Sequence, residues 1–270
     1  MLCCNAMASS GILSAIMLEH PTSPIVQVLL DPESLALTAA EFIVQAAQSA
    51  IHDQGRFSLA LAGGNTPRLA YRRLASPDFA GRLDWKNIHI FWGDERCVAM
   101  DSPDSNFRMA KEALLDRVPI PAENIHAAHA DLEPDSAASQ YEMELRAFFG
   151  SFGAQDDRLT TFDLILLGLG DDGHTASLFP GSPALSETGR WVMHVEHSQP
   201  PPPLVPRLTL TLPAINAAER AAFLVSVGSK AKILANVFSH PDKRLPAQLI
   251  RLDHGQIFWL VDQDAAASLP

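Results

Sequence analysis

Short apolar runs alternate with longer segments of helical periodicity along almost the whole chain, and this alternation constrains the fold more than any other sequence feature. The pattern predicts strands at 25–30, 57–62, 88–92, 162–167, 191–196, 207–212, 221–227 and 256–261. It predicts helices at 32–52, from Pro67 onward, and at 104–116, 134–149 and 229–238. Strands that alternate with helices form a mostly parallel sheet with helices on both faces. We therefore expect a Rossmann-like α/β fold.

No internal repeat and no strong linker interrupts this pattern, so we expect a single α/β domain over residues 24–270. Residues 1–18 carry no charged side chain and lack the basic segment that begins a secretory signal. We expect residues 1–23 to form a disordered leader, with a targeting peptide as the alternative interpretation.

The composition argues against several classes of protein. Twenty Lys and Arg stand against 31 Asp and Glu, and the net charge of −11 disfavours binding to nucleic acid or to an anionic membrane surface. No apolar run reaches the roughly 20 residues that a membrane-spanning helix needs. Three cysteines are too few for a disulfide framework or a four-cysteine zinc site, which fits a cytoplasmic protein. We expect a monomer or a weak homodimer.

Four unusual loops follow predicted strands, after Ala62, Trp92, Leu167 and Val227. Ligands bind at the carboxyl ends of the strands in open parallel sheets. Because the chain is acidic overall, a site for an anionic substrate would need positive groups and backbone amides to converge at these loops.

The first of these loops reads Gly63-Gly64-Asn65-Thr66-Pro67. Two glycines allow the backbone to approach a ligand closely, and proline at the start of a helix leaves free amides pointing outward. Free amides at a helix N-terminus bind phosphate readily. An ordinary strand-to-helix turn is an equally acceptable interpretation of this loop.

Charged residues mark the other loops. Asp94, Glu95 and Arg96 follow a strand, and this triplet is either part of a site or a solvated loop. Arg207 opens a strand, whereas Lys230 starts a helix, where a cation opposes the helix dipole. An unfavourable charge at the ligand edge hints at a binding role for Lys230, with an ordinary surface lysine as the alternative.

The loop after Leu167 contains Gly168, Gly170 and Gly173 in the spacing G-x-G-x-x-G, which is typical of dinucleotide-binding turns. Two observations argue against a dinucleotide. Asp171 and Asp172 would place two carboxylates where a pyrophosphate should lie. Pro180 and Pro183 also break the helix that such a turn requires.

The same loop fits proton transfer better, because Asp172 and His174 flank Gly173. A carboxylate beside an imidazole fixes its orientation and stabilises its protonated form. A capping aspartate beside a surface histidine is the alternative. We expect no metal, since His126 with His129, and His194 with His197, each lack a third ligand. No G-x-S-x-G motif supports a serine nucleophile.

Several of these segments together resemble the 6-phosphogluconolactonase family. The resemblance rests on motifs in the family's order, which are 63–67, 91–96, Ser105-Asn106, 168–180 and 207–211, and it spans Ile25 to Val261. In the family's pattern a glycine stands where this chain has Val227.

The resemblance implies hydrolysis of 6-phospho-D-glucono-1,5-lactone to 6-phospho-D-gluconate in the oxidative pentose phosphate pathway, with no cofactor. It implies that His174 activates water and that Asp172 supports it. It also implies that the substrate is held by Gly63, Gly64, Asn65, Thr66, Asp94, Arg96, Asn106, Arg207 and Lys230.

Glucosamine-6-phosphate deaminases and isomerases are the main alternative, because they share the glycine loop and the Asp-Gly-His sequence. That family places a glutamate five residues after the histidine, where this chain has Phe179. A non-catalytic phosphosugar-binding protein is a further alternative, which the intact Asp172–His174 pair disfavours.

Overall fold

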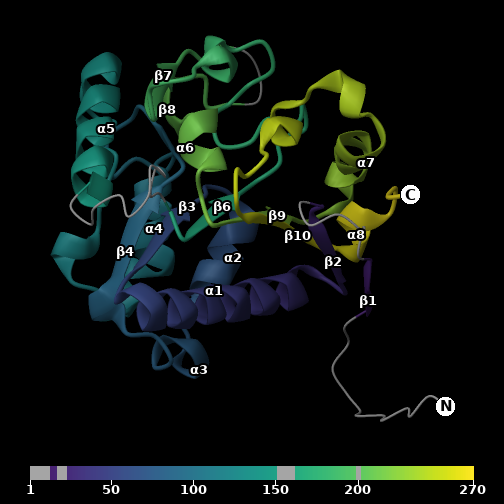
Figure 1. The fold of residues 1–270 in the computed structure, drawn as a ribbon, viewed down its shortest axis with the longest axis horizontal. Coiled ribbons are helices and arrows are strands. Elements are labelled where there is room, and N and C mark those ends of the chain that lie inside the picture. Colours follow the sequence, from purple (N-terminus) through teal and green to yellow (C-terminus); the bar gives the residue numbers. More distant parts are fainter. Residues whose placement is uncertain (1–12, 17–22, 151–161, 199–201) are drawn as a thin grey trace.

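The computed structural model describes residues 13–16, 23–150, 162–198 and 202–270 and shows a parallel sheet between two layers of other elements (Figure 1). The order of its strands is β1-β2-β10-β9-β6-β3-β4. Their bounds are β1 Leu13–Ile16, β2 Ile25–Leu29, β3 Phe57–Leu61, β4 Ile88–Trp92, β6 Leu164–Leu167, β9 Arg220–Val225 and β10 Gln256–Asp262. All neighbouring pairs are parallel except β1 with β2. The expected α/β fold with a mostly parallel sheet is confirmed.

A second, three-stranded antiparallel sheet has the order β5-β8-β7. Its strands are β5 Asp94–Arg96, β7 Val192–Val195 and β8 Arg207–Leu210. Two expectations are corrected here. The charged triplet after β4 is a strand rather than a loop. The strands predicted at 191–196 and 207–212 do not join the parallel sheet but form this second sheet with it, in which β8 lies between β5 and β7.

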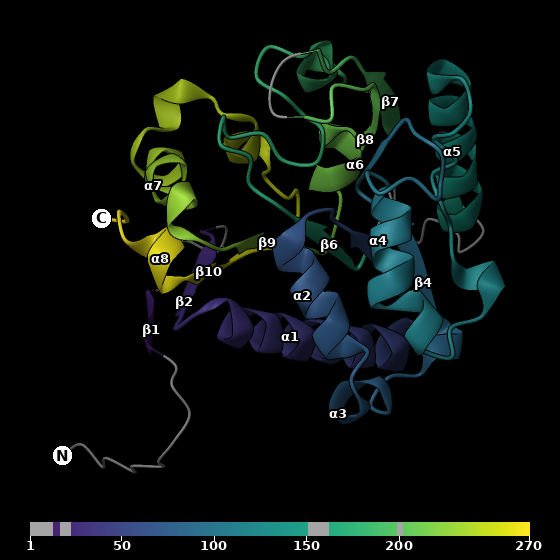
Figure 2. The same ribbon diagram turned by 180° about the vertical axis from the view of Figure 1, so that it is seen from behind.

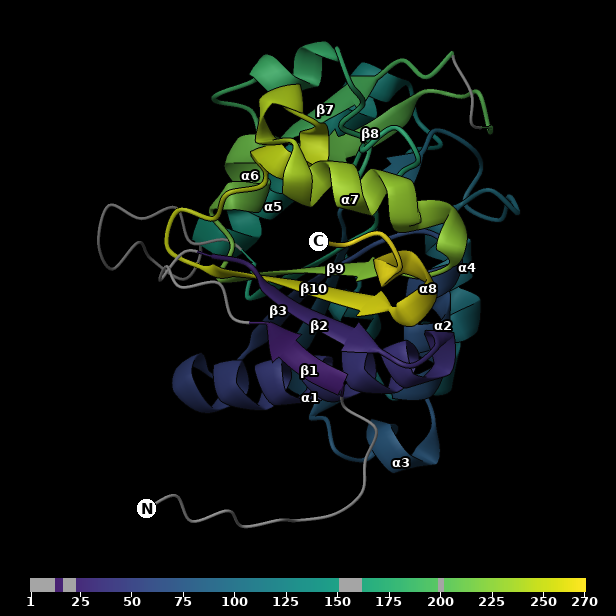
Figure 3. The same ribbon diagram turned by 90° about the vertical axis from the view of Figure 1, so that its right-hand side faces the viewer.

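Helices cover both faces of the parallel sheet, as Figures 1 and 2 show from opposite sides. One layer holds α1 Pro32–Gln54, α2 Asn65–Leu74, α3 Pro77–Ala80 and α4 Asn106–Ala113. The other holds α5 Pro134–Gly150, α6 Leu212–Asn216 and α7 Ala231–Ser239, together with the second sheet, and Figure 3 shows the parallel sheet edge-on between the layers. The last helix is α8 Gln263–Ala266. Short 3₁₀ helices are η1 Trp85–Asn87, η2 Leu115–Arg117, η3 Ala122–Asn124, η4 Pro183–Ser186, η5 Gly228–Lys230, η6 Pro241–Lys243 and η7 Pro246–Leu249.

Alternate residues of the central strands build two separate cores. In β3, Leu59 and Leu61 pack toward α1, α2 and α4, whereas Ala60 joins the core beneath α5 and the second sheet. Successive side chains of a strand point to opposite faces, so a strand buried on both faces must be apolar at every position. The run at β6 meets this condition, and β3 departs from it only at Ser58, whose buried hydroxyl donates to the Asp163 carboxylate at 2.7 Å.

The helix α1 bears on the expectation that no segment spans a membrane. By length and composition it could cross a bilayer, although no such segment was expected from the sequence. In the structure it is a core helix, with nine buried residues against the sheet and α2, capped by Asp31 and ended by Gly55. A buried, alanine-rich helix passes the same composition test as a membrane span.

The first part of the chain is described only in part. Leu13–Ile16 pair with β2 as an edge strand, within the segment that we expected to be a leader. Residues 1–12 and 17–22 of that segment lie outside the described residues.

The chain adds strands to the parallel sheet in opposite directions from two adjacent strands, β3 and β6. From β3 the chain continues to its neighbour β4, whereas from β6 it continues to β9 on the opposite side. The loops that leave β3 and β6 therefore diverge and open a crevice at the carboxyl ends of the strands, which is where such sheets bind ligands.

Candidate active site

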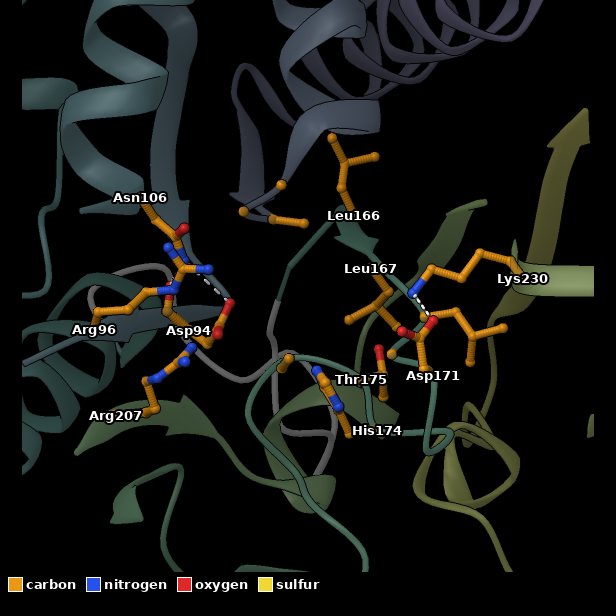
Figure 4. Close-up of a pocket in the computed structure, with 18 residues that line it drawn as sticks. Asp94, Arg96, Asn106, Leu166, Leu167, Asp171, His174, Thr175, Arg207 and Lys230 are labelled. Atoms are coloured by element: carbon orange, nitrogen blue, oxygen red, sulfur yellow. Dashed lines mark hydrogen bonds and ion pairs between the residues drawn. The ribbon is translucent and has the colours of Figure 1, made fainter. Parts of the chain in front are cut away.

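A cavity of about 220 Å³ lies at this crevice (Figure 4). Eight of the predicted site residues line it: Gly63, Gly64, Asp94, Arg96, Asn106, His174, Arg207 and Lys230. Asn65 and Thr66 begin α2 and do not line it, because the helix starts two residues before the predicted Pro67. Asp172 does not line it either, since its carboxylate lies beside the imidazole of His174.

The imidazole of His174 lies at the cavity (Figure 4), and Asp172 contacts its Nδ1 atom. His174 Nδ1 lies 2.6 Å from Asp172 Oδ1, and the same oxygen accepts the backbone amide of His174 at 3.0 Å. Partial burial works to raise the pKa of Asp172, but these hydrogen bonds outweigh it and hold that pKa below its usual value. A charged Asp172 keeps the proton on Nδ1, so Nε2 of the neutral ring is free to accept one.

Gly170 is required by the position of this ring. Any side chain at Gly170 would collide with the imidazole of His174. The amide of Gly170 also donates to the His174 carbonyl at 2.8 Å, and this bond closes the turn. Gly173 adopts a φ of 85°, which glycine reaches without strain. Two glycines of the G-x-G-x-x-G spacing, Gly170 and Gly173, therefore serve the turn that carries the histidine.

No helix follows this turn before the short η4 within the described residues, so the crossover helix that a dinucleotide site needs is absent there. His194 pairs with Asp135 and His126 pairs with Glu144, so these histidines are engaged elsewhere. In the described part of the chain, no three His, Cys, Asp or Glu side chains are grouped to hold a metal ion.

Two arginines form a cationic wall on the side of the cavity next to the second sheet (Figure 4). Arg96 and Arg207 are directly opposite each other in the register of β5 and β8. Like charges at opposed positions of an antiparallel pair repel, and the nearby carboxylate of Asp94 offsets part of this repulsion. Burial lowers the pKa of Arg207, although nearby Asp94 counteracts this.

The arginines retain unused hydrogen-bonding capacity. Arg207 is 6% exposed, and its Nη2 donates to the Pro203 carbonyl at 3.0 Å. Arg96 Nη1 donates to the Asp104 carbonyl at 2.6 Å. The Nε atoms of both arginines are buried and have no hydrogen-bond partner among the described residues. A buried guanidinium with a free donor suits a negatively charged oxygen.

Glu95 anchors the cationic wall, a role that the sequence did not reveal. It is 3% exposed, and its carboxylate accepts backbone amides from Arg96, Asn106 and Phe107, each at 2.7 Å. A fourth bond comes from the Ser105 hydroxyl at 3.1 Å. The carboxylate thereby fastens the N-terminus of α4 to β5. A clue lay in the sequence, since alternation within 94–96 turns Asp94 and Arg96 to one face and Glu95 to the other.

Asn106 and Gly63 meet at the floor of the site. The Asn106 amide donates to the Asp94 carbonyl at 2.9 Å. A side chain at Gly63 would collide with this amide. Asp94 is held further by the Ser177 hydroxyl at 2.6 Å, which ties the loop of His174 to β5. Ser177 also escaped sequence analysis, because a serine three residues after the histidine carries no recognisable signal.

The opposite side of the cavity carries Lys230. Its Nζ lies 2.6 Å from Asp171 Oδ1, and a dashed line marks this ion pair in Figure 4. Lys230 is the N-cap of α7, as predicted from its place at a helix start. Val227, which stands where the family's pattern has glycine, adopts a φ of 76° and is therefore strained.

Fold and site define a class of protein, an α/β enzyme with a carboxylate-oriented histidine between cationic groups at the ligand edge of its sheet. The chain belongs to the glucosamine-6-phosphate isomerase/6-phosphogluconolactonase family, whose model matches residues 30–259.

Individual relatives are more specific. The chain is 43% identical to a 6-phosphogluconolactonase of Nostoc over 90% of its own length and 98% of the relative's. It is 43% identical to one of Synechocystis over 92% of its length and 99% of that relative. The solved 6-phosphogluconolactonase of Trypanosoma brucei is 30% identical and superimposes with a TM-score of 0.80 over 92% of this chain and 100% of that one.

Proposed function

We propose that this enzyme hydrolyses 6-phospho-D-glucono-1,5-lactone to 6-phospho-D-gluconate. The observation that carries the proposal is the placement of an oriented imidazole, His174, in a cavity whose other wall presents the cations Arg96 and Arg207, of which Arg207 is buried. We infer the substrate from the names of the similar proteins. The cavity offers a base and an anion site that suit this substrate.

In the proposed mechanism, water attacks the lactone carbonyl while His174 Nε2 takes its proton. The carbon–oxygen bond of the ring then breaks, and the ring oxygen leaves as a hydroxyl after receiving that proton from the imidazole. Asp172 stabilises the imidazolium that forms between the two steps. General-base assistance of this kind contributes about 10²–10⁴-fold to a rate.

We assign the phosphate to the cationic groups and the glycine loop. Gly64 caps α2 without a side chain, so the first amides of the helix stay available to an anion. Arg96, Arg207 and Lys230 add charge-assisted hydrogen bonds, each worth about 1.5–3 kcal/mol. The phosphate is remote from the bond that breaks, so its binding energy positions the carbonyl against the base.

The deaminase alternative is less well supported by the residues around the base. Phe179 lies against the His174 ring at a centroid distance of 4.7 Å, where a second acid–base group would be needed to open a sugar ring. The aromatic ring offers no proton to that step. Lactone hydrolysis needs a base and an anion site, and both are present.

Substrate comparison tests the proposal. Proton release should be measured with freshly made 6-phospho-glucono-δ-lactone and with unphosphorylated glucono-δ-lactone, each corrected for spontaneous hydrolysis. We expect kcat/KM to favour the phosphorylated lactone by about 10²-fold or more, because two charge-assisted bonds are worth roughly 3–6 kcal/mol. Efficient deamination of glucosamine 6-phosphate without lactone hydrolysis would contradict the proposal.

A further inference from the structure

We infer that Asp171 competes with anionic ligands for the ammonium group of Lys230 and thereby weakens binding of the product. The inference rests on the proposed function, because it concerns the same cavity. The ion pair joins two loops, one after β6 and one after β9, across the side of the cavity that faces the arginine wall. An anionic group that enters this side must displace Asp171 to reach Lys230.

Three carboxylates lie at or beside the cavity, and their partners differ. Asp94 is held by the Ser177 hydroxyl and by Asn106. Asp172 is engaged by the ring and the amide of His174. Asp171 is 72% exposed, and Lys230 is its one hydrogen-bonding partner among the described residues. Asp171 is therefore the carboxylate that a ligand can displace at least cost.

The position of Lys230 does not depend on Asp171. The carboxylate of Asp262 accepts the Ser226 hydroxyl at 2.6 Å and the amide of Val227 at 3.0 Å. The Lys230 amide in turn donates to the Val227 carbonyl at 3.0 Å. The backbone that carries Lys230 is thus fixed from its own side of the sheet. Loss of Asp171 would free the flexible lysine chain without moving its base.

Lys230 requires a negative partner in this position. It caps the N-terminus of α7, where the helix dipole disfavours a cation. Asp171 satisfies that requirement from the neighbouring loop, and a phosphate or carboxylate of the ligand satisfies it equally well. Because the pair is largely exposed on the Asp171 side, exchange of one anion for the other is a modest energetic step.

Lactone opening adds a carboxylate, so the product carries one more negative charge than the substrate. Competition by Asp171 for Lys230 therefore acts more strongly on the product than on the lactone. Asp171 weakens product binding, and it does so through Lys230.

A double-mutant cycle tests this inference. Binding of 6-phosphogluconate is measured by calorimetry for the wild type, Asp171→Asn, Lys230→Met and the double variant. We expect Asp171→Asn to tighten binding by about two- to five-fold, as for loss of an exposed ion pair. In the Lys230→Met background the same substitution should change binding by less than about two-fold, because the ammonium is gone. Asp242→Asn, an exposed residue outside the cavity, is the control for the same change in net charge and should leave binding unaltered.

Other outcomes overturn the inference. Unchanged or weaker binding in Asp171→Asn would do so, as would equal tightening with and without Lys230, since that result indicates general charge repulsion. Lack of product binding by all four proteins would also contradict it. Failure of the proposed function is seen separately, as absence of lactone hydrolysis by the wild type.

Discussion

The ring of His174 is held by three different kinds of contact. Asp172 fixes Nδ1, the missing side chain of Gly170 gives the ring its space, and Phe179 packs against it at 4.7 Å. Phe179 in turn stacks on His197 at a centroid distance of 4.3 Å. A ring that is oriented in this way loses little freedom when it accepts a proton, which favours catalysis.

The absence of a side chain at Gly170 leads to a prediction about kcat. Gly170→Ala should displace the imidazole and lower kcat by about 10²-fold, a cost typical of a misplaced catalytic group. Gly168→Ala is the matched control, because a side chain there meets no atom within 4 Å although it lines the same cavity. Steady-state kinetics of the two variants measure the difference. Equal activities would show that the ring does not depend on Gly170.

The charge of Asp172 should affect how the reaction rate depends on pH. Its pKa lies below the usual value, so it remains charged while the imidazole takes up a proton on acidification. A nearby negative charge favours the imidazolium, so its removal makes the ring harder to protonate. Asp172→Asn should therefore lower kcat and move the acid limb of the pH–rate profile to lower pH. A limb that stays in place would argue against electrostatic coupling between the two groups.

The residue-level site was only partly visible in the sequence. His174 and Asp172 are two positions apart in one loop, so their contact follows from local geometry. The opposition of Arg96 and Arg207 depends on the register of two strands far apart in the chain, which no local pattern specifies. Asp171 was interpreted as a charge that repels phosphate, and its pairing with Lys230 needed the positions of two loops.

Among the elements, β5 contributes most to the site and was the hardest to predict. A strand of three charged residues has no apolar alternation, so periodicity assigned it to a loop. Pairing with β8 makes this segment a strand. The pairing turns Asp94 and Arg96 toward the cavity and Glu95 toward α4. The short strand is therefore the element that joins the cationic wall to the helix layer.

The substitution Glu95→Gln tests whether the Glu95 carboxylate holds α4 against β5. Glutamine is neutral and has one acceptor oxygen in place of two, so one of the two α4 backbone amides bound by the carboxylate is left without an acceptor. We expect a loss of about 2 kcal/mol in the free energy of unfolding, measured by urea denaturation. Glu112→Gln on the same helix is the control, since its ion pair with Arg108 is exposed and should contribute less than about 1 kcal/mol. Equal stability of the two variants would contradict the claim that Glu95 fastens α4 to β5.

For the molecule as a whole, the alternation of strands and helices predicted the layers and the place of the ligand edge. The strand order was not predictable in the same way, because an apolar run shows that a strand exists but does not name its neighbours. The strands β7 and β8 show the limit, since they leave the parallel sheet for the second sheet, where β8 pairs with β5 and β7 pairs with β8. The reversal between β3 and β6, which opens the crevice, likewise appears only in three dimensions.

The most direct test of the account compares two histidine–aspartate pairs of the same molecule. His174 lies 2.6 Å from Asp172 in the cavity, and His194 lies 2.7 Å from Asp135 outside it. Proton release from freshly made 6-phospho-glucono-δ-lactone is measured for the wild type, His174→Ala and His194→Ala, with circular dichroism to verify folding. We predict wild-type acceleration above the spontaneous rate, full activity in His194→Ala, and a loss of about 10²–10⁴-fold in kcat for folded His174→Ala. Near wild-type activity in His174→Ala would contradict the assignment of the base.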